Sequence, residues 1–294
     1  MTNTHEKRLC LVVPYFGRWP FWFDFFLTSC GWNPSVDWLF YTDCDIPDAH
    51  PANVRFVPCS FAEYCQKVSA ALRIRFEPDN AYKLCDLKPA LGAVHEDDLR
   101  DYAYFGFGDI DVIWGDVAGW LYPRLAKHHC VSTHATRISG HLCAFHNTQA
   151  LREAFRRAPD WQACLENPAH TRFDEAQFSK VFLRYKNWPR WARRLIDRAD
   201  PLRRDALFEE SFSTPGCRIA WRDGREVYPT VWYCRPAQLC NDLDGTQPFP
   251  YVHFLAWKRD WRDDADPRSA RVRVEPAIDR GWQLSAAGFD PLEH

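Results

Sequence analysis

Short apolar segments alternate with segments of helical character through the N-terminal part of the chain, and this alternation constrains the fold most. We predict strands at Leu9–Val13, Asp37–Tyr41, Val54–Val57 and Tyr102–Phe107. Helices are expected between them at Phe21–Thr28, Phe61–Leu72 and Asn80–Val94, the last interrupted or kinked at Pro89. Strands that alternate with helices build an α/β fold with a mainly parallel, doubly wound sheet flanked by helices.

A smaller mixed part is expected to follow. We predict helices at Trp120–Leu125, Asn147–Arg157 and Phe173–Leu183, and strands near Cys130–His134, Leu142–His146, Ile219–Trp221, Val227–Tyr233 and Val252–Ala256. Asn147 or Thr148 is the expected cap of one helix and Asp174 of another. No internal repeat and no low-complexity linker divides the sequence, so residues 1–294 are predicted to form one domain.

Composition narrows the classes of protein. The formal charge of -2 gives no electrostatic signature of a nucleic-acid binder. The apolar run before Pro14 is too short for a signal peptide, and no segment approaches the roughly 20 apolar residues that span a bilayer. We therefore expect a cytoplasmic protein, in which the 12 cysteines, none of them in a C-x-x-C pair, are reduced and structural.

Asp109 and Asp111 follow the apolar strand predicted at Tyr102–Phe107. Side chains alternate along extended chain, so the D-x-D spacing places both carboxylates on one side. Such a pair suits Mg²⁺ or Mn²⁺, which can also bridge the oxygens of a diphosphate. The same spacing occurs at Asp43/Asp45, Asp242/Asp244 and Asp264/Asp266, but only Asp109/Asp111 are preceded by a strand with two glycines, expected to let backbone and a bulky ligand approach closely. The alternative for this pair is a solvated turn.

Four sequence blocks together resemble a known class of enzyme: LVVPYFG near the start, YTDCD at 41–45, YKLCDLKPALG at 82–92 and FGFGDIDVIWGD at 105–116. They are similar to bacterial GT-A-type glycosyltransferases with a DXD motif, a poorly characterised set associated with surface polysaccharide synthesis. The resemblance covers residues 8–180 in order. It implies a Rossmann-like half at 8–116 that binds a nucleotide-diphospho-sugar, an acceptor-side half at 117–260, and dependence on Mn²⁺ or Mg²⁺.

The resemblance also implies roles for residues near the nucleotide. Pro14, Tyr15 and Phe16 match the end of the first strand, which receives the nucleobase and ribose, and Asp43 matches an acidic position near the nucleoside. Lys83 and Asp86 match residues that line the donor sugar or phosphates, and Asp86 is also a catalytic candidate. Lys83 and Lys88 could each offer a charge to phosphate, whereas a helix-face ion pair Lys83–Asp86 is the alternative.

Further roles are implied for residues later in the chain. His253 in YVHFLAWK looks like a third metal ligand, and Lys258 like the lysine that steadies the leaving diphosphate, although the glycine expected between them is missing. Gly140 and His141 resemble the loop between donor and acceptor sugars. Asp174 and Glu175 occupy the place of an acidic residue near the acceptor, a general base in an inverting enzyme. Structural alternatives are a satisfied core histidine for His253, a surface turn for 140–141 and a helix cap for Asp174.

The predicted function is transfer of a hexose from a nucleotide sugar, with UDP the expected nucleotide, onto a surface glycan or lipid-linked acceptor. The resemblance at His253 and Lys258 favours a retaining over an inverting enzyme. Residues 184–205, basic and with Trp188 and Trp191, are interpreted as a helical insert that either contacts the inner face of the plasma membrane or props two parts of the protein. A sugar nucleotidyltransferase and a non-catalytic scaffold of polysaccharide assembly are the alternatives.

Overall fold

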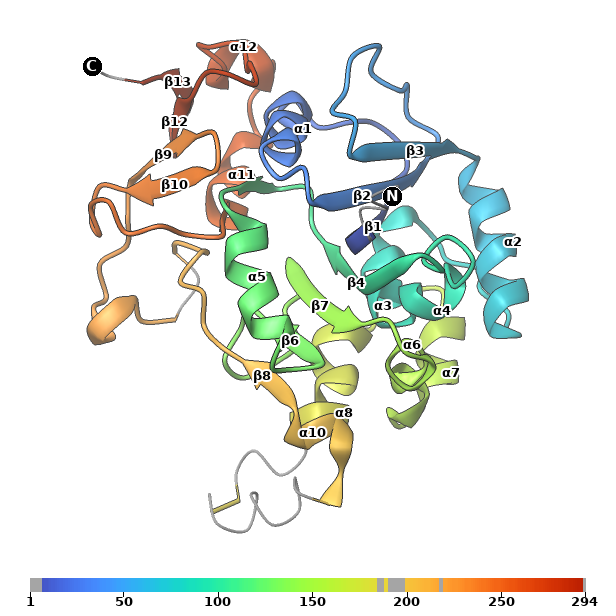
Figure 1. Cartoon of the computed structure of the whole chain (residues 1–294). Helices are drawn as coiled ribbons and strands as arrows, with labels where there is room; N and C mark the ends of the chain where they lie inside the picture. The colour runs from blue at the N-terminus through green and yellow to red at the C-terminus, as the bar shows by residue number, and fades with distance from the viewer. Residues whose placement is uncertain (1–6, 184–187, 190–198, 217–218, 293–294) are drawn as a thin grey trace, which may run out of the picture.

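The large sheet is the centre of the molecule (Figure 1), and a computed structural model describes it within residues 7–183, 188–189, 199–216 and 219–292. Its strand order is β3-β2-β1-β4-β7-β6-β8. The bounds are β1 Lys7–Pro14, β2 Val36–Thr42, β3 Val54–Pro58, β4 Tyr102–Gly108, β6 Cys130–Ser132, β7 Leu142–His146 and β8 Ala206–Phe208. β3, β2, β1 and β4 pair in parallel, whereas β7 is antiparallel to β4 and to β6. The predicted α/β fold with a mainly parallel sheet is therefore confirmed.

Both faces of the sheet are covered, as the strand sequences require. In β1, Cys10 and Val12 belong to one core while Leu9, Leu11 and Val13 belong to the other. The first core packs against α2 (Phe61–Leu72), α6 (Gln149–Arg152), α7 (Trp161–Glu166) and α8 (Ser179–Leu183). The second packs against α1 (Phe23–Gly31) and α5 (Val117–Leu125). The period-two alternation thus sends successive β1 side chains into two separate layers.

The helical segment predicted at Asn80–Val94 is broken into four short pieces. These are η1 (Ala81–Lys83), α3 (Leu84–Leu87), η2 (Lys88–Ala90) and α4 (Leu91–Val94). Pro89 lies in η2, where its ring and missing N–H interrupt a regular α-helix as predicted. Lys83 ends η1 and Lys88 begins η2, and the ammonium groups of the two lysines contact different aspartates, Asp86 and Asp109. They consequently serve two different sites.

Helix ends differ from the sequence prediction in two places. The helix expected at Phe173–Leu183 begins as a π-helix, η4 (Phe173–Phe178), and continues as α8. Its cap position is Arg172, in the left-handed conformation, so the prediction of Asp174 as cap is wrong and Asp174 lies buried in the first turn. The helix expected at Asn147–Arg157 is split into α6, with Thr148 at its cap position, and η3 (Ala154–Arg157).

The C-terminal region forms a second sheet, which lies apart from the large one at upper left in Figure 1. Its antiparallel order is β10-β9-β12-β13, with β9 Val231–Arg235, β10 Gln238–Asn241, β12 Trp282–Ser285 and β13 Gly288–Pro291. Trp232, Trp282 and Phe289 form its core together with Phe25 of α1. The prediction of a strand at Ile219–Trp221 is wrong, because Trp221 precedes a 3-10 turn, η5 (Arg222–Gly224). The C-terminus contains β12 and β13 and the short helix α12 (Pro267–Arg271), elements that the sequence pattern did not predict.

A third, two-stranded sheet links the two regions. β5 (Val112–Trp114) follows the D-x-D segment and pairs antiparallel with β11 (Tyr251–His253), which leads into α11 (Leu255–Trp261). In this register His253 pairs with Val112, the neighbour of Asp111. The pairing brings residues separated by about half the chain to one point.

The described residues contain neither a disulfide nor a helix able to span a membrane. Every cysteine that the structure describes is a free thiol. Among the described residues, none of the helices has the length and apolar character needed to traverse a bilayer.

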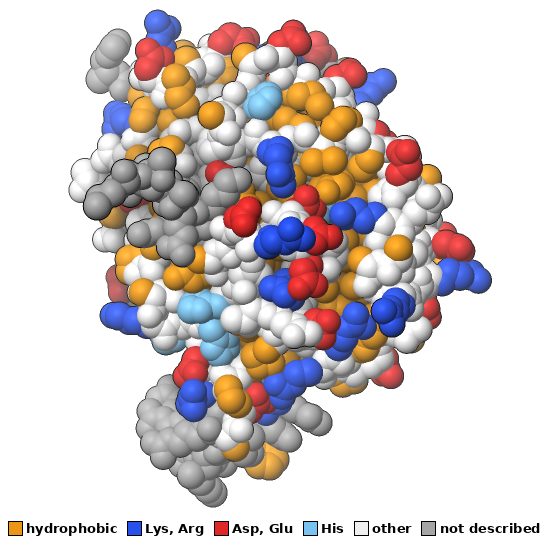
Figure 2. Space-filling view, turned by 45° about the vertical axis from the view of Figure 1, so that its right-hand side comes forward, with side chains coloured by type: hydrophobic (Ala, Val, Ile, Leu, Met, Phe, Trp, Pro, Cys, Tyr) orange, Lys and Arg blue, Asp and Glu red, His pale blue; other side chains and the backbone are white. Residues whose placement is uncertain are grey.

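Most of the segment 184–205 lies outside the described residues. Its described end contains α10 (Pro201–Arg204), and the Asp200 carboxylate before this helix pairs with the Arg157 guanidinium at 2.6 Å. Acidic and basic side chains alternate in the middle of the face in Figure 2 and are bordered by hydrophobic patches.

Candidate functional site

The carboxyl ends of β1 and β4 form the edge at which a ligand is expected. β1 and β4 are neighbours, but the chain runs outward from β1 through β2 to β3 before it returns to β4. In such sheets the crevice at this reversal of strand order is the usual ligand site. A cavity of about 370 Å³ lies there, and it is lined by Pro14, Tyr15 and Phe16 after β1 and by Asp109 and Asp111 after β4. The D-x-D pair therefore faces a cavity of ligand size.

His253 completes a group of three metal-ligating side chains. One ligand atom from each of Asp109, Asp111 and His253 lies within 4.8 Å of the others. His253 Nε2 is 3.2 Å from Asp111 Oδ2, and its Nδ1 is 3.3 Å from the hydroxyl of Thr214. Nε2 donates to the Asp111 carboxylate in this geometry, so metal binding requires the ring proton on Nδ1, where Thr214 can accept it. Two carboxylates and one imidazole fit Mn²⁺ well and Mg²⁺ acceptably.

Asp111 is a buried carboxylate held in its charged form. Burial by itself would raise its pKa, but His253 and Lys258 hold the pKa well below its usual range. Lys258 Nζ lies 2.5 Å from Asp111 Oδ2, and Lys258 comes from the first turns of α11. The charged form of Asp111 is thus available at neutral pH, and Lys258 lies next to it.

Lys88 is the matching cation for Asp109. Its Nζ donates to Asp109 Oδ1 at 2.5 Å and to the carbonyl oxygen of Gly140 at 2.9 Å. Burial would lower the pKa of Lys88, but Asp109 and other nearby acids raise it well above the usual value. We call Lys88, Asp109, Asp111, His253 and Lys258 the open cluster, because four of the five line the 370 Å³ cavity.

Arg262 adds a third cation to this cavity, and the sequence analysis missed it. It lies at the C-terminal cap of α11, four residues after Lys258, and both side chains line the cavity. Residues at i and i+4 share one helix face, so a prediction of Lys258 together with α11 would have pointed to Arg262. The lining of the cavity therefore includes three cations, Lys88, Lys258 and Arg262, in addition to its two aspartates.

Lys83 and Asp86 form a separate site that does not line the cavity. Lys83 Nζ donates to Asp86 Oδ2 at 2.8 Å and to the carbonyls of Cys164 and Ala169 at 2.7 and 2.9 Å. Asp86 also accepts the N–H groups of Thr171 and Phe173 at 2.6 and 2.7 Å, and His170 Nε2 lies 3.4 Å away. We call Lys83, Asp86, His170, Thr171 and Phe173 the closed cluster. The geometry corresponds to the structural alternative for the two residues, an ion pair, and this ion pair is buried. All three ammonium hydrogens of Lys83 donate hydrogen bonds to the three acceptors named above.

Of the residues predicted to contact the nucleoside, Tyr15 and Phe16 line the cavity and Asp43 does not. Tyr15 stacks on Trp19 with ring centroids 5.1 Å apart, and burial raises its pKa to about 12. Phe16 packs against Tyr64. Asp43 is exposed, accepts the N–H of Gly17 at 2.7 Å and does not line the cavity. Its visible role is to hold the loop after β1 rather than to face a ligand.

The 139–142 loop and the acidic pair 174–175 meet behind the open cluster. The rings of His141 and His253 are 4.5 Å apart, and burial holds the pKa of His141 well below its usual value. A side-chain carbon at Gly140 would lie 3.4 Å from Asp174 Oδ2 and 3.5 Å from Lys88 Nζ, so the loop passes directly beside both groups. Asp174 is buried and burial raises its pKa to about 6, although Lys88 opposes the shift. Glu175, His141 and His253 line a second, smaller cavity of about 60 Å³.

The glycines in β4 allow the close approach of backbone, one of the two purposes predicted for them. A side-chain carbon at Gly106 would lie 2.4 Å from the carbonyl oxygen of Cys143 in β7, and one at Gly108 would lie 3.2 Å from that of His141. Both glycines therefore let β7 and the 139–142 loop pack closely on β4. Gly108 also lines the 370 Å³ cavity, whereas the approach of a ligand to it stays a prediction.

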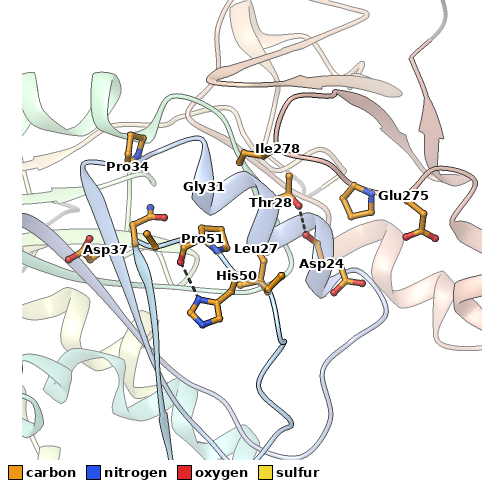
Figure 3. A pocket seen from close by; sticks show the side chains of 14 residues that line it. Asp24, Leu27, Thr28, Gly31, Pro34, Asp37, His50, Pro51, Glu275 and Ile278 are labelled. Atoms are coloured by element: carbon orange, nitrogen blue, oxygen red, sulfur yellow. Dashed lines mark hydrogen bonds between the residues drawn. The ribbon is translucent and has the colours of Figure 1, made fainter.

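A larger cavity, about 860 Å³, lies elsewhere (Figure 3). Asp37, at the start of β2, and Asn53, just before β3, line it, so it belongs to the amino ends of the parallel strands. Figure 3 shows Ile278 and Glu275 bordering it from the C-terminal region and Leu27 from α1. Its mainly apolar wall contains no cluster of metal-ligating groups among the described residues, so size does not identify the chemical site here.

Comparison with known proteins places the chain in a family without assigning a reaction. Residues 11–277 match a family of unknown function (DUF6625), and the chain belongs to that family. No curated protein matches the sequence significantly.

Proposed function

We propose that the protein is a metal-dependent glycosyltransferase that moves a hexose from a nucleotide-diphospho-sugar to a surface glycan or a lipid-linked acceptor. One observation carries the proposal: Asp109, Asp111 and His253 converge within 4.8 Å at the reversal of strand order. The resemblance of the sequence blocks to GT-A-type enzymes gives this geometry its chemical meaning. GT-A architecture in the strict sense is part of the proposal, beyond the α/β fold described above.

The charges around the cavity favour a diphosphate ligand. Lys88, Lys258 and Arg262 surround the two aspartates, so the site combines cations for phosphate oxygens with carboxylates for a metal ion. Lys88 and Lys258 each lie 2.5 Å from one aspartate. In the proposed complex these lysines would exchange part of that contact for phosphate oxygens. Charged phosphate oxygens gain more from these cations than a neutral ligand does.

The residues divide the proposed work among them. Tyr15 and Phe16 provide an aromatic wall for the nucleoside, and Asp109, Asp111 and His253 would hold Mn²⁺ or Mg²⁺. When bound, the metal would stabilise the negative charge that develops on the leaving nucleoside diphosphate. Lys258 and Arg262 would neutralise the same charge from α11. His141 and Glu175, on the far side of His253, would face the sugars.

Several finer points belong to the proposal as well. UDP is the proposed nucleotide, and retention of configuration is favoured by the implied role of His253 and Lys258. Asp174, buried beside Lys88, and Glu175, at the small cavity, are the acids proposed near the acceptor. A cytoplasmic location, with contact between residues 184–205 and the inner face of the plasma membrane, completes the proposal.

The test is release of nucleotide from a panel of nucleotide sugars with Mn²⁺, together with thermal stabilisation by UDP and Mn²⁺. Asp109→Asn should lose the release of UDP, and Asp111→Asn should lose the stabilisation, which amounts to about 2.7 kcal/mol at a hundredfold excess over Kd. Asp45→Asn is a matched control, because Asp45 belongs to another D-x-D sequence but is exposed. UDP release that persists in EDTA, or stabilisation that survives in Asp111→Asn, would refute the proposal.

A further inference from the structure

The small cavity behind His253 has a wall with an unusual pattern of hydrogen-bonding atoms. Glu210, in the segment after β8, and His134, after β6, both line it. Glu210 Oε2 is buried and has no hydrogen-bond partner among the described residues, and the same holds for Arg137 Nε, whose side chain also lines the cavity. Leaving buried polar atoms unpaired is costly unless a ligand or water satisfies them.

His134 cannot satisfy Glu210. The backbone N–H of Thr136 donates to His134 Nδ1 at 3.1 Å, so this nitrogen is an acceptor and the ring proton is on Nε2. Burial lowers the pKa of His134 to about 4, and the positive charge of nearby Arg137 contributes to the same shift. The ring is therefore neutral at pH 7. His134 Nδ1 and Glu210 Oε2 face each other at 3.9 Å as two acceptors with no proton between them.

The surroundings restrict what could be bound. Glu175 and Glu210 would repel an anion such as phosphate, while Arg137, 3.5 Å from Glu175, disfavours a cation. Backbone N–H groups of Ala135 and Phe212 lie near the Glu210 carboxylate, although burial outweighs them and raises its pKa. A hydroxyl group both donates and accepts, so it can serve the carboxylate and the guanidinium together. Trp221 supplies an aromatic side chain in the same wall, suited to the apolar face of a sugar ring.

We infer that this cavity binds a hydroxylated end of a saccharide, with Glu210 Oε2 accepting a hydrogen bond from a sugar hydroxyl. At about 60 Å³ the cavity holds several water molecules or one edge of a sugar, not a whole disaccharide. His253 belongs to the open cluster and also lines this cavity, so the two sites are neighbours that share one residue. The identity of the saccharide rests on the proposed function: if that function is correct, the bound saccharide is the acceptor. Glu210 is then a binding residue that the sequence analysis did not identify.

The experiment measures binding of methyl glycosides of glucose, galactose and mannose by saturation-transfer NMR, without metal or nucleotide. We expect the wild type to bind at least one of them and Glu210→Gln to bind it about tenfold more weakly, because a charge-assisted hydrogen bond is lost. Glu209→Gln is the matched control, since Glu209 pairs with Arg124 at 2.6 Å and does not line the cavity. Ala220→Trp, at an exposed position on the rim, should also abolish binding by filling the cavity without altering the core.

The outcomes separate this inference from the proposed function. No binding of any glycoside to the wild type, or equal affinities in Glu209→Gln and Glu210→Gln, would overturn the inference. Asp111→Asn should keep glycoside binding while losing stabilisation by UDP and Mn²⁺. Glycoside binding that depends on Glu210 in a protein that UDP and Mn²⁺ never stabilise would remove the proposed function and leave the saccharide site intact.

Discussion

The closed and the open cluster use the same kinds of side chain for different ends. Both pair a buried lysine from the 80–94 segment with an aspartate, Lys83 with Asp86 and Lys88 with Asp109. In the closed cluster Asp86 is fully buried and Lys83 has three acceptors. In the open cluster Asp109 is 30% exposed and faces a cavity. Saturated hydrogen bonding identifies a structural pair, and a pair that borders a cavity is free to change partners.

The difference has a physical origin in the cost of burying charge. A carboxylate far from water must be compensated completely, so the closed cluster ties η1 and α3 to the 164–173 segment. A carboxylate beside a cavity is partly compensated by water and can accept a metal ion or release a lysine. The two clusters are therefore expected to respond differently to the same substitution.

The largest expected effect is on the closed cluster. Lys83→Met should lower the free energy of unfolding by about 3–5 kcal/mol, because it leaves the buried Asp86 charge without its cation. Denaturant unfolding measures this change. Lys180→Met, at an exposed lysine on α8, should stay within about 0.5 kcal/mol of the wild type. If Lys83→Met lowered the free energy of unfolding as little as the control does, the buried ion pair of the closed cluster would not have the structural role described.

Asp174 lies between the two clusters and should give stability a distinct pH dependence. Its pKa is raised to about 6, so the folded protein keeps the proton that the unfolded chain loses near pH 4. The Asp174 contribution therefore falls as pH rises from about 4 to 6, by on the order of 2 kcal/mol. Asp174→Asn should remove this slope and be the more stable protein at pH 7. Unfolding curves at several pH values test the sign, with Glu175→Gln as the more exposed control.

Lys88→Met tests whether the open cluster tolerates the loss of its lysine. We expect a smaller loss of stability than for Lys83→Met, about 1–2 kcal/mol, because water can reach Asp109 through the cavity. Stabilisation by UDP and Mn²⁺ should vanish in the same variant, since the proposed phosphate contact is gone. Thermal unfolding with and without the ligands measures both effects. Equal destabilisation by the two lysine substitutions would mean that the clusters do not differ as described.

The smallest change is expected at the edge of the open cluster. Arg262→Gln should weaken UDP binding about tenfold, equivalent to about 1.4 kcal/mol, and leave unfolding unchanged. Arg259→Gln is the control, because Arg259 is on the same helix but exposed and away from the cavity. Isothermal titration of UDP in the presence of Mn²⁺ distinguishes the two. Equal affinities for both variants would exclude Arg262 from the phosphate site.

Local patterns predicted the parts of the fold that depend on neighbouring residues. Helix α2 begins and ends as predicted, and its start is fixed by Ser60 and Glu63, which form a reciprocal capping box. The strands β1 to β4 were predicted within a few residues, because apolar runs closed by turn residues specify them. The predicted break at Pro89 follows from proline chemistry alone.

Other features could not be read locally. β12 and β13 are stabilised by Trp32 and Phe25, more than 200 residues earlier, so their own polar residues gave little signal. The β4 glycines indicated that other groups pack closely on this strand. Only the pairing of β4 with β7 shows which backbone segment does so. Glu210 was missed because nothing in its own neighbourhood marks it as lining a cavity, whereas Arg262 was missed because the helix that places it four residues after Lys258 was not predicted.

The sequence by itself determined that the chain builds a mainly parallel sheet with two acids at the end of a buried strand, since strand period and apolar character are local properties. The tertiary structure decided which side chains join those acids. The β5–β11 pairing brings His253 and Lys258 to Asp111, and the broken helix sends Lys88 to Asp109 while Lys83 is enclosed with Asp86. Such meetings depend on contacts between residues distant in the chain, which no local pattern encodes.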